Sequence, residues 1–281
     1  MTLQRLHRPD AYLRRLGLQS RPPATLAALA DLQARHVASI PFETLDSLLR
    51  RPVPIDLASL EAKILERGRG GYCYELNRLF IALLAELGFA VRPLSGRVVM
   101  GEPGDALPPR THLFAAVAID GGEWLADVGF GGSVPTAPLR LGEAAPQPTP
   151  HGRYRLVPRG ADLLLEAEMA DAWRSLYRFD LVSPAPIDDE VANWYVATHP
   201  ASPFPGRLRV ALAPPGVRHA LDGGRYTLHR VGGSSERHAL NDASAVVALL
   251  REVFGLPVVA DAALAAALDA LIDAVEVKGV A

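Results

Sequence analysis

The amino-acid sequence predicts an α+β protein made of three successive parts, and three observations support this prediction. Apolar residues recur at helical spacing up to about residue 90. From there, short segments separated by Gly and Pro read as strands of an antiparallel sheet or barrel. After a Pro-rich passage at 198–206, which marks a domain junction, strands are followed by two closing helices. A chain of 281 residues is long enough for this division.

The first part contains three predicted helices with recognisable ends. The helix within 24–40 has Thr25 as its N-cap, and the helix at 56–67 begins with Asp56 in the same role. The third helix follows the glycine-rich segment "GRGG" and stops at Gly88. Its apolar residues have the most regular spacing in the chain: Leu76, Leu79, Phe80, Leu83, Leu84 and Leu87.

The middle part is a series of short predicted strands. Asp120-Gly121-Gly122 joins two of them, and we expect the two-residue turn itself to be Gly121-Gly122. A second hairpin, 152–169, turns at Arg159-Gly160. The other strands are predicted at 90–100, 111–119, 123–130 and 174–182.

The last part ends in two helices. Asn241 or Asp242 caps the first of them. The second is rich in alanine, the residue with the highest helix propensity, so we interpret it as ordered helix and not as a disordered tract. Strands are expected at 208–215 and 225–231, and helices at 243–254 and 261–275.

Composition and charge narrow the class of protein. The chain has a net charge of −2, with 49% hydrophobic and 21% charged residues and no long basic run, so we expect neither nucleic acid nor a membrane as a partner. No apolar stretch reaches the ~18 residues of a membrane span, and the N-terminus has no signal-peptide core. A single cysteine excludes an internal disulfide and a multi-cysteine metal site. We therefore expect a cytoplasmic protein without a metal.

That cysteine, Cys73, lies in "GRGGYCYELN", where the glycine-rich loop meets the start of the third helix. Unpaired N–H groups and the helix dipole stabilise a thiolate at such a position, and Arg69 can add to the effect. Gly68, Gly70 and Gly71 permit close approach, which leaves room for a bulky thioester. A small buried thiol with a structural role is the competing interpretation, because free cysteine is among the most buried residue types.

A nucleophilic cysteine needs a base, and the base needs an orienting group. His112, in "RTHLF", begins a strand that turns back into the strand bearing Asp127, in "LADVGFGG". With the expected turn, Asp127 pairs opposite Ala116, an even number of positions from His112, so both side chains share a face. They are not directly opposite, and a bulge or strong twist must close the gap. A surface histidine and a turn-forming aspartate are the structural alternative.

Several segments, in one order along the chain, resemble the arylamine N-acetyltransferases. "IPFETLD" (40–46) is similar to the family's IPFENLD segment, "RGGYCYELN" to its nucleophile motif, "RTHLF" to its histidine motif and "LADVGFGG" to its aspartate motif. "TPHGRYRL" (149–156) and "EVANWYVATHPASPF" (190–204) resemble bacterial members of the family. The part beyond about residue 206 matches more weakly.

The resemblance implies a cysteine-protease-like triad between the first two of three domains. Cys73 is then the acetyl acceptor, His112 its base and Asp127 the residue that orients the imidazole. The implied domains are an N-terminal helical bundle at 1–92, an antiparallel β-barrel at 93–205 and a C-terminal α/β lid at 206–281. The chain departs from the family pattern at Thr44, Leu76 and Arg78, none of which belongs to the triad.

The implied activity is the acetyl-CoA-dependent N-acetylation of arylamines, arylhydrazines and hydrazides, in two steps through an S-acetyl-cysteine. Acetyl-CoA is then a co-substrate, no permanently bound cofactor is required, and a homodimer is left open. Candidates for binding CoA or the acceptor are Arg69, Tyr72, Tyr74, Thr111, Gly129, Phe130 and Gly131.

Two other functions use the same three residues. An amide synthase closes a polyketide macrolactam from a carrier thioester, and acetyl-CoA would not label Cys73 in such an enzyme. A thiol hydrolase or a transglutaminase-like enzyme would be deacylated rapidly by water or would accept a peptide.

Overall fold

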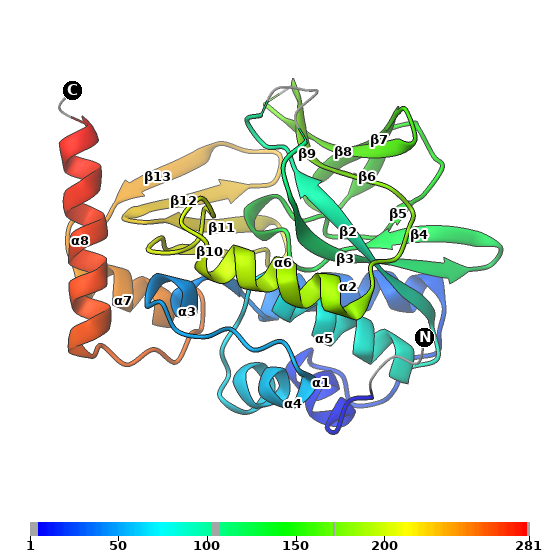
Figure 1. Cartoon of the computed structure of the whole chain (residues 1–281), viewed down its shortest axis with the longest axis horizontal. Helices are drawn as coiled ribbons and strands as arrows, with labels where there is room; N and C mark the ends of the chain where they lie inside the picture. Colours follow the sequence, from blue (N-terminus) through cyan, green and yellow to red (C-terminus); the bar gives the residue numbers. More distant parts are fainter. Residues whose placement is uncertain (1–4, 103–106, 171, 280–281) are drawn as a thin grey trace.

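The computed structural model describes residues 5–102, 107–170 and 172–279. The helices of the first part lie beneath a strongly curved sheet, and a second sheet with two helices of its own lies at the other end of the molecule (Figure 1). The protein is thus a mixed helix and sheet protein, as predicted, and the curved sheet of eight strands is a nearly closed barrel. None of the described helices has the length and apolar composition of a membrane span.

The predicted helices of the first part are confirmed, with one irregularity. The Ala28 N–H donates to the Thr25 hydroxyl (3.3 Å), and the Ser59 N–H donates to the Asp56 carboxylate (2.9 Å). The second helix widens into a π-helix after one turn, where the Arg67 N–H bonds to the carbonyl five residues back. The short helices α1 and α3 are additional to the prediction. The helices are α1 (Pro9–Arg15), α2 (Leu26–Ser39), α3 (Leu45–Leu48), α4 (Leu57–Leu60), η1 (Glu61–Glu66, the π-helix) and α5 (Cys73–Glu86).

Helix α5 is the centre of the first part. From Cys73 to Leu84 nearly every side chain is buried, which is typical of a helix enclosed by other elements. The largest cluster of buried apolar side chains surrounds it and includes Leu113, Ala115 and Val117 of the barrel strand β3. This contact places the first residue of α5 against the barrel.

The barrel sheet has the strand order β5-β4-β3-β2-β9-β8-β7-β6. Its two edges are joined by the Gln147 amide, which accepts the Arg140 N–H (2.7 Å) and donates to the Arg140 carbonyl (3.1 Å). Phe114 and Ala116 of β3 point into the barrel core, whereas Leu113, Ala115 and Val117, which alternate with them, face α5. The strands are β2 (Ala90–Val98), β3 (Arg110–Ile119), β4 (Gly122–Ala126), β5 (Leu139–Arg140), β6 (Gln147–Thr149), β7 (Gly152–Arg159), β8 (Asp162–Met169) and β9 (Ala172–Phe179).

The turn between β3 and β4 differs from the predicted one. Ile119 pairs with Gly122, so the two-residue turn is Asp120-Gly121 and the prediction of Gly121-Gly122 is wrong. Both turn residues have positive φ, 51° and 73°. This is the conformation of the type I′ turn that fits the twist of a hairpin, and it suits an Asp-Gly pair.

The observed register brings the predicted histidine and aspartate closer together. The last pair of the hairpin is Ala115 with Ala126, so the next residue, Asp127, lies level with Phe114. Asp127 is therefore two residues from His112 along β3, and not four as the predicted turn required. The even spacing is retained, and both side chains lie on the barrel face of the strand.

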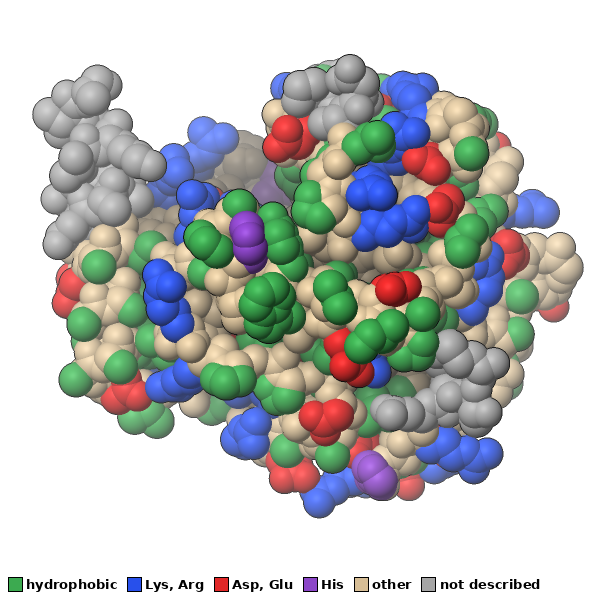
Figure 2. Space-filling model, in the orientation of Figure 1, with side chains coloured by type: hydrophobic (Ala, Val, Ile, Leu, Met, Phe, Trp, Pro, Cys, Tyr) green, Lys and Arg blue, Asp and Glu red, His purple; other side chains and the backbone are tan. Residues whose placement is uncertain are grey.

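Helix α6 (Pro186–Thr198) was not predicted, and its reversed pattern explains why. Ile187, Val191 and Trp194 stand at helical spacing, but each is at least 60% exposed. Asn193 is buried instead, and its amide donates to the Val53 carbonyl (2.9 Å). Hydrophobic side chains accordingly gather over α6 on the face seen in Figure 2. Pattern rules assign the apolar face of a helix to the core, and here that assignment fails.

The second sheet has the order β1-β10-β11-β12-β13, so a strand from the first part forms its edge. Leu45 and Leu48 of α3 also pack in the apolar cluster of this sheet and its helices. The domain boundaries near 92 and 205 stay predictions. The strands are β1 (Phe42–Glu43), β10 (Arg209–Leu212), β11 (Val217–Asp222), β12 (Arg225–Arg230) and β13 (Ser235–Ala239); the helices are α7 (Ala243–Glu252), which is capped by Asp242, and α8 (Ala262–Gly279).

Candidate active site

The glycine-rich loop before α5 is packed tightly against the segment 41–43. The Gly71 N–H donates to the Pro41 carbonyl (3.3 Å), and the Glu43 N–H donates to the Gly71 carbonyl (2.9 Å). A Cβ on Gly70 would lie 2.0 Å from the Pro41 oxygen. The expectation that these glycines leave room for a thioester is therefore wrong. They allow two backbones to touch, which fixes the loop that carries Cys73.

A buried ion pair lies beneath this loop. The Glu75 carboxylate accepts the Tyr72 N–H (3.0 Å) and a hydrogen bond from Lys63 Nζ (2.6 Å). Burial raises the pKa of Glu75 to about 7, although the ammonium of Lys63 opposes the rise. Burial also disfavours the charge on Lys63, but the neighbouring carboxylates outweigh it and hold the pKa of Lys63 above its usual value. The pair secures the first turn of α5 through the Tyr72 backbone.

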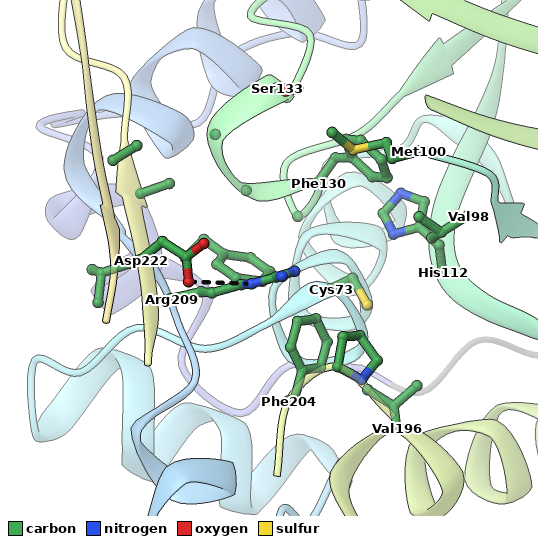
Figure 3. A pocket seen from close by; sticks show the side chains of 18 of the residues that line it. Cys73, Val98, Met100, His112, Phe130, Ser133, Val196, Phe204, Arg209 and Asp222 are labelled. Atoms are coloured by element: carbon green, nitrogen blue, oxygen red, sulfur yellow. Dashed lines mark ion pairs between the residues drawn. The ribbon is translucent and has the colours of Figure 1, made fainter. Parts of the chain in front are cut away.

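Cys73, His112 and Asp127 are brought together from the start of α5, from β3 and from the loop after β4. His112 Nε2 lies 2.7 Å from Asp127 Oδ2, and both side chains are almost fully buried. The carboxylate occupies Nε2, so Nδ1 is the ring nitrogen left for the sulfur of Cys73. Figure 3 shows the Cys73 and His112 side chains facing the same space. The Cys73 thiol also donates to the Thr111 carbonyl (3.6 Å).

The electrostatics of this group favour a proton on His112. Burial alone lowers the pKa of a histidine, as it does for the buried His36, whose pKa falls to about 3 with a further contribution from Arg15. For His112, burial is outweighed by the charge and hydrogen bond of Asp127, and Cys73 adds to the effect, so its pKa rises to about 9. Burial likewise opposes the charge of Asp127, but the same pairing and amide donors hold its pKa below the usual value.

The partners that hold Asp127 were not predicted. Its Oδ1 accepts hydrogen bonds from Asn77 Nδ2 and from the Gly129 N–H, both 2.9 Å, and its Oδ2 accepts one from Tyr177 Oη (2.9 Å) beside that of His112. All four acceptor positions of the carboxylate are therefore filled. Asn77 could have been predicted from the sequence, because it is a polar residue on a largely apolar helix one turn after the cysteine. Nothing in the sequence distinguished Tyr177.

A cavity of about 380 Å³ lies beside Cys73 and His112, between the barrel and the second sheet. Four of the predicted binding residues line it: Thr111, Gly129, Phe130 and Gly131. Phe42 is an unpredicted lining residue. Others, labelled in Figure 3, are Val98, Met100, Phe204, Arg209 and Asp222. Within the described ranges, no group of three or more His, Cys, Asp or Glu side chains is arranged to hold a metal ion.

The other three predicted binding residues do not line this cavity. The Arg69 guanidinium donates to the Glu43 carboxylate (2.7 Å) in the charge cluster under the loop. Tyr72 and Tyr74 are each 1% exposed. The Tyr72 hydroxyl donates to the Asn193 side chain, and the Tyr74 hydroxyl donates to a backbone carbonyl (3.4 Å). These side chains support the walls of the site without reaching its interior.

A thiol, an imidazole and a carboxylate beside an apolar cavity are typical of enzymes that transfer acyl groups through a cysteine. Residues 25–263 match the family model described as N-acetyltransferase. The chain is 45% identical over 269 residues to the arylamine N-acetyltransferase of Mycobacterium tuberculosis, covering 94% of both proteins. It is 41% identical over 255 residues to the arylamine N-acetyltransferase / N-hydroxyarylamine O-acetyltransferase of Salmonella typhimurium, covering 88% of both.

Solved structures agree with the sequence comparison. The Mycobacterium marinum arylamine N-acetyltransferase in complex with CoA superposes with a TM-score of 0.89 at 42% identity, covering 93% of this chain and 98% of that one. The chain belongs to the arylamine N-acetyltransferase family and is an acyltransferase.

Proposed function

We propose that the chain acetylates arylamines, arylhydrazines and hydrazides in two steps, with acetyl-CoA as donor and Cys73 as acyl carrier. The hydrogen-bond contact of His112 with Asp127, beside a cavity that both His112 and Cys73 line, is the observation that carries this proposal. The CoA complex of the M. marinum relative supports a CoA thioester as donor. No permanently bound cofactor is needed, a cytoplasmic location is part of the proposal, and homodimerisation is left open.

In the first step, the Cys73 proton passes to His112 and the sulfur attacks the thioester carbonyl. The bond between the carbonyl carbon and the CoA sulfur breaks, the leaving sulfur takes the proton from His112, and the acetyl group remains on Cys73. The raised pKa of His112, about 9, keeps the imidazolium available at neutral pH to protonate the leaving group.

In the second step, the acceptor nitrogen attacks the carbonyl of the acetylated Cys73. The nitrogen proton passes to His112, the carbon–sulfur bond breaks, and the thiolate and imidazolium are restored. Arylamines and hydrazides suit this step because they are uncharged and nucleophilic near neutral pH, where most aliphatic amines are protonated.

The start of α5 offers donors for the oxyanion that forms in both steps. Cys73 and Tyr74 are the first two residues of the helix, so their N–H groups precede the first intrahelical hydrogen bond. The first hydrogen bonds at this end of the helix run from the Glu75 and Leu76 N–H groups to the Tyr72 carbonyl, so the Cys73 and Tyr74 N–H groups take no part in them. We assign the Cys73 and Tyr74 N–H groups as the oxyanion donors on this basis.

Intact-mass spectrometry after mixing with acetyl-CoA tests the proposal. We expect one acetyl adduct that is discharged by an arylamine and is absent in Cys73→Ala. An adduct that survives in Cys73→Ala would contradict the assignment of the nucleophile. Absence of any adduct on the parent chain would favour an amide synthase with another donor, and rapid loss of the adduct to water alone would favour a hydrolase.

A further inference from the structure

The cavity beside Cys73 contains a guanidinium that the two-step reaction does not use. Arg209 lies on β10, and its side chain extends into the cavity toward the nucleophile (Figure 3). It is the only Lys or Arg among the described residues that line the cavity. Most of the other lining side chains are apolar, and three of them, Phe42, Phe130 and Phe204, are aromatic.

The donors of this guanidinium are not engaged within the described part of the chain. The nearest carboxylate is that of Asp222, and the distance from Arg209 Nε to Asp222 Oδ1 is 3.9 Å, too long for a hydrogen bond. The guanidinium lies 5.9 Å from the centre of the Phe204 ring. Its backbone is fixed, because the Arg209 N–H donates to the Thr44 hydroxyl (2.9 Å). A positioned cation with free N–H groups therefore faces an otherwise apolar space.

We propose that Arg209 is a specificity-determining residue that binds a carboxylate on the acceptor, so that aminobenzoates are preferred over neutral arylamines of the same shape. This inference rests on the proposed function. A planar guanidinium can bind a carboxylate through two parallel hydrogen bonds. Arg209 does not form such a pair with Asp222, because their contact is too long. The aromatic side chains supply apolar contact for the ring between the carboxylate and the amine.

The phosphates of CoA are the other anions that this cation can meet. They are separated from the thioester by the long pantetheine arm, whereas the acceptor carboxylate is separated from the reacting amine by a single ring. Cys73 and Arg209 line the same cavity, which fits the shorter separation better. The acceptor is therefore the source of the anion that the structure favours.

The test is the ratio of kcat/KM for 3- and 4-aminobenzoate to kcat/KM for the matching aminobenzamides, which differ in charge but hardly in shape. Arg209→Gln should lower this ratio about tenfold, the size of one charge-assisted hydrogen bond at a partly exposed site. Arg209→Lys should lower it less, and Asp222→Asn should raise it. Arg237→Gln is the matched control, because Arg237 is an exposed arginine of β13 outside the cavity, and it should leave the ratio unchanged.

An unchanged ratio in Arg209→Gln would overturn the inference. A second result would also overturn it: Arg209→Gln raises the KM for acetyl-CoA and no longer discriminates against 3′-dephospho-acetyl-CoA, while the ratio of kcat/KM values stays the same. The anion bound by Arg209 would then be a CoA phosphate. Thermal unfolding reports whether each variant is folded. If Arg209→Gln does not fold, the ratio is measured in Arg209→Lys instead. Labelling of Cys73 by acetyl-CoA is measured first: its absence refutes the proposed function, whereas labelling with an unchanged ratio refutes only the role of Arg209.

Discussion

Replacing Asp127 by Asn removes the carboxylate that favours a proton on His112. Two buried histidines indicate the size of the effect: the pKa of His36, whose hydrogen-bond partner is the Tyr12 hydroxyl, falls to about 3, whereas that of His112 rises to about 9. Without the carboxylate, we expect the pKa of His112 to fall below its ordinary value of about 6.5. Each pKa unit is a factor of ten, so the equilibrium constant for transfer of a proton from Cys73 to His112 should fall at least about a hundredfold.

The alkylation of Cys73 by iodoacetamide at pH 7 measures this change, because its rate follows the amount of thiolate. Asp127→Asn should react up to about thirtyfold more slowly than the parent chain, because an ordinary thiol with a pKa near 8.5 is still about 3% ionised at pH 7. Asp31→Asn is the matched control, since Asp31 is an exposed residue of α2 whose carboxylate contacts Arg35. A folded Asp127→Asn variant that reacts within about threefold of the parent rate would refute the argument that this carboxylate maintains the thiolate.

Three further predictions concern stability. The pKa of His112 in the folded protein, about 9, lies above its unfolded value of about 6.5, so protonation of His112 stabilises the fold. This stabilisation is complete below about pH 6.5 and is lost as the pH rises through 9. In urea unfolding, the free energy of unfolding should therefore fall between pH 6 and pH 10 by about 3 kcal/mol more in the parent chain than in His112→Gln. Gly129→Ala should lower the free energy of unfolding by about 1–3 kcal/mol and remove most activity, because the new Cβ would lie 2.8 Å from the Cys73 Cα. Gly132→Ala is the control: its Cβ would meet nothing closer than 3.8 Å, so the melting temperature should stay the same. Lys63→Met leaves the buried carboxylate of Glu75 without its only cationic partner and should cost about 3–5 kcal/mol in urea unfolding.

Local sequence was enough to predict the elements whose signals act at short range. Thr25 and Asp56 cap their helices as expected, because an N-cap needs only a side-chain oxygen and the next turn of backbone. The hairpin turn was misplaced by one residue, since Asp120-Gly121 and Gly121-Gly122 both suit a tight turn. Helix α6 was missed because the partner of its buried Asn193 is a carbonyl 140 residues away in the sequence.

The same division applies to the candidate site. Cys73, His112 and Asp127 each stand in a motif that local sequence displays, and the hairpin parity already placed two of them on one face. Tyr177 and Arg209 come from strands whose positions depend on the closure of the barrel and on the placement of the second sheet. No local pattern marks such residues, because their surroundings are set by long-range packing.

The polar groups near Cys73 are more fully buried and hydrogen-bonded than those that the strands of the second sheet contribute to the cavity. Asp127 is inaccessible and has every acceptor position filled, whereas the Arg209 side chain is 39% exposed and has one loosely placed carboxylate beside it. Chemistry at the sulfur requires charges that are fixed before the reaction, because reorganising them would add to the barrier. Recognition of varied amines tolerates looser groups, which adjust to each ligand. Substitutions on β10 and β11 are therefore expected to change which acceptors react while the alkylation rate of Cys73 stays the same.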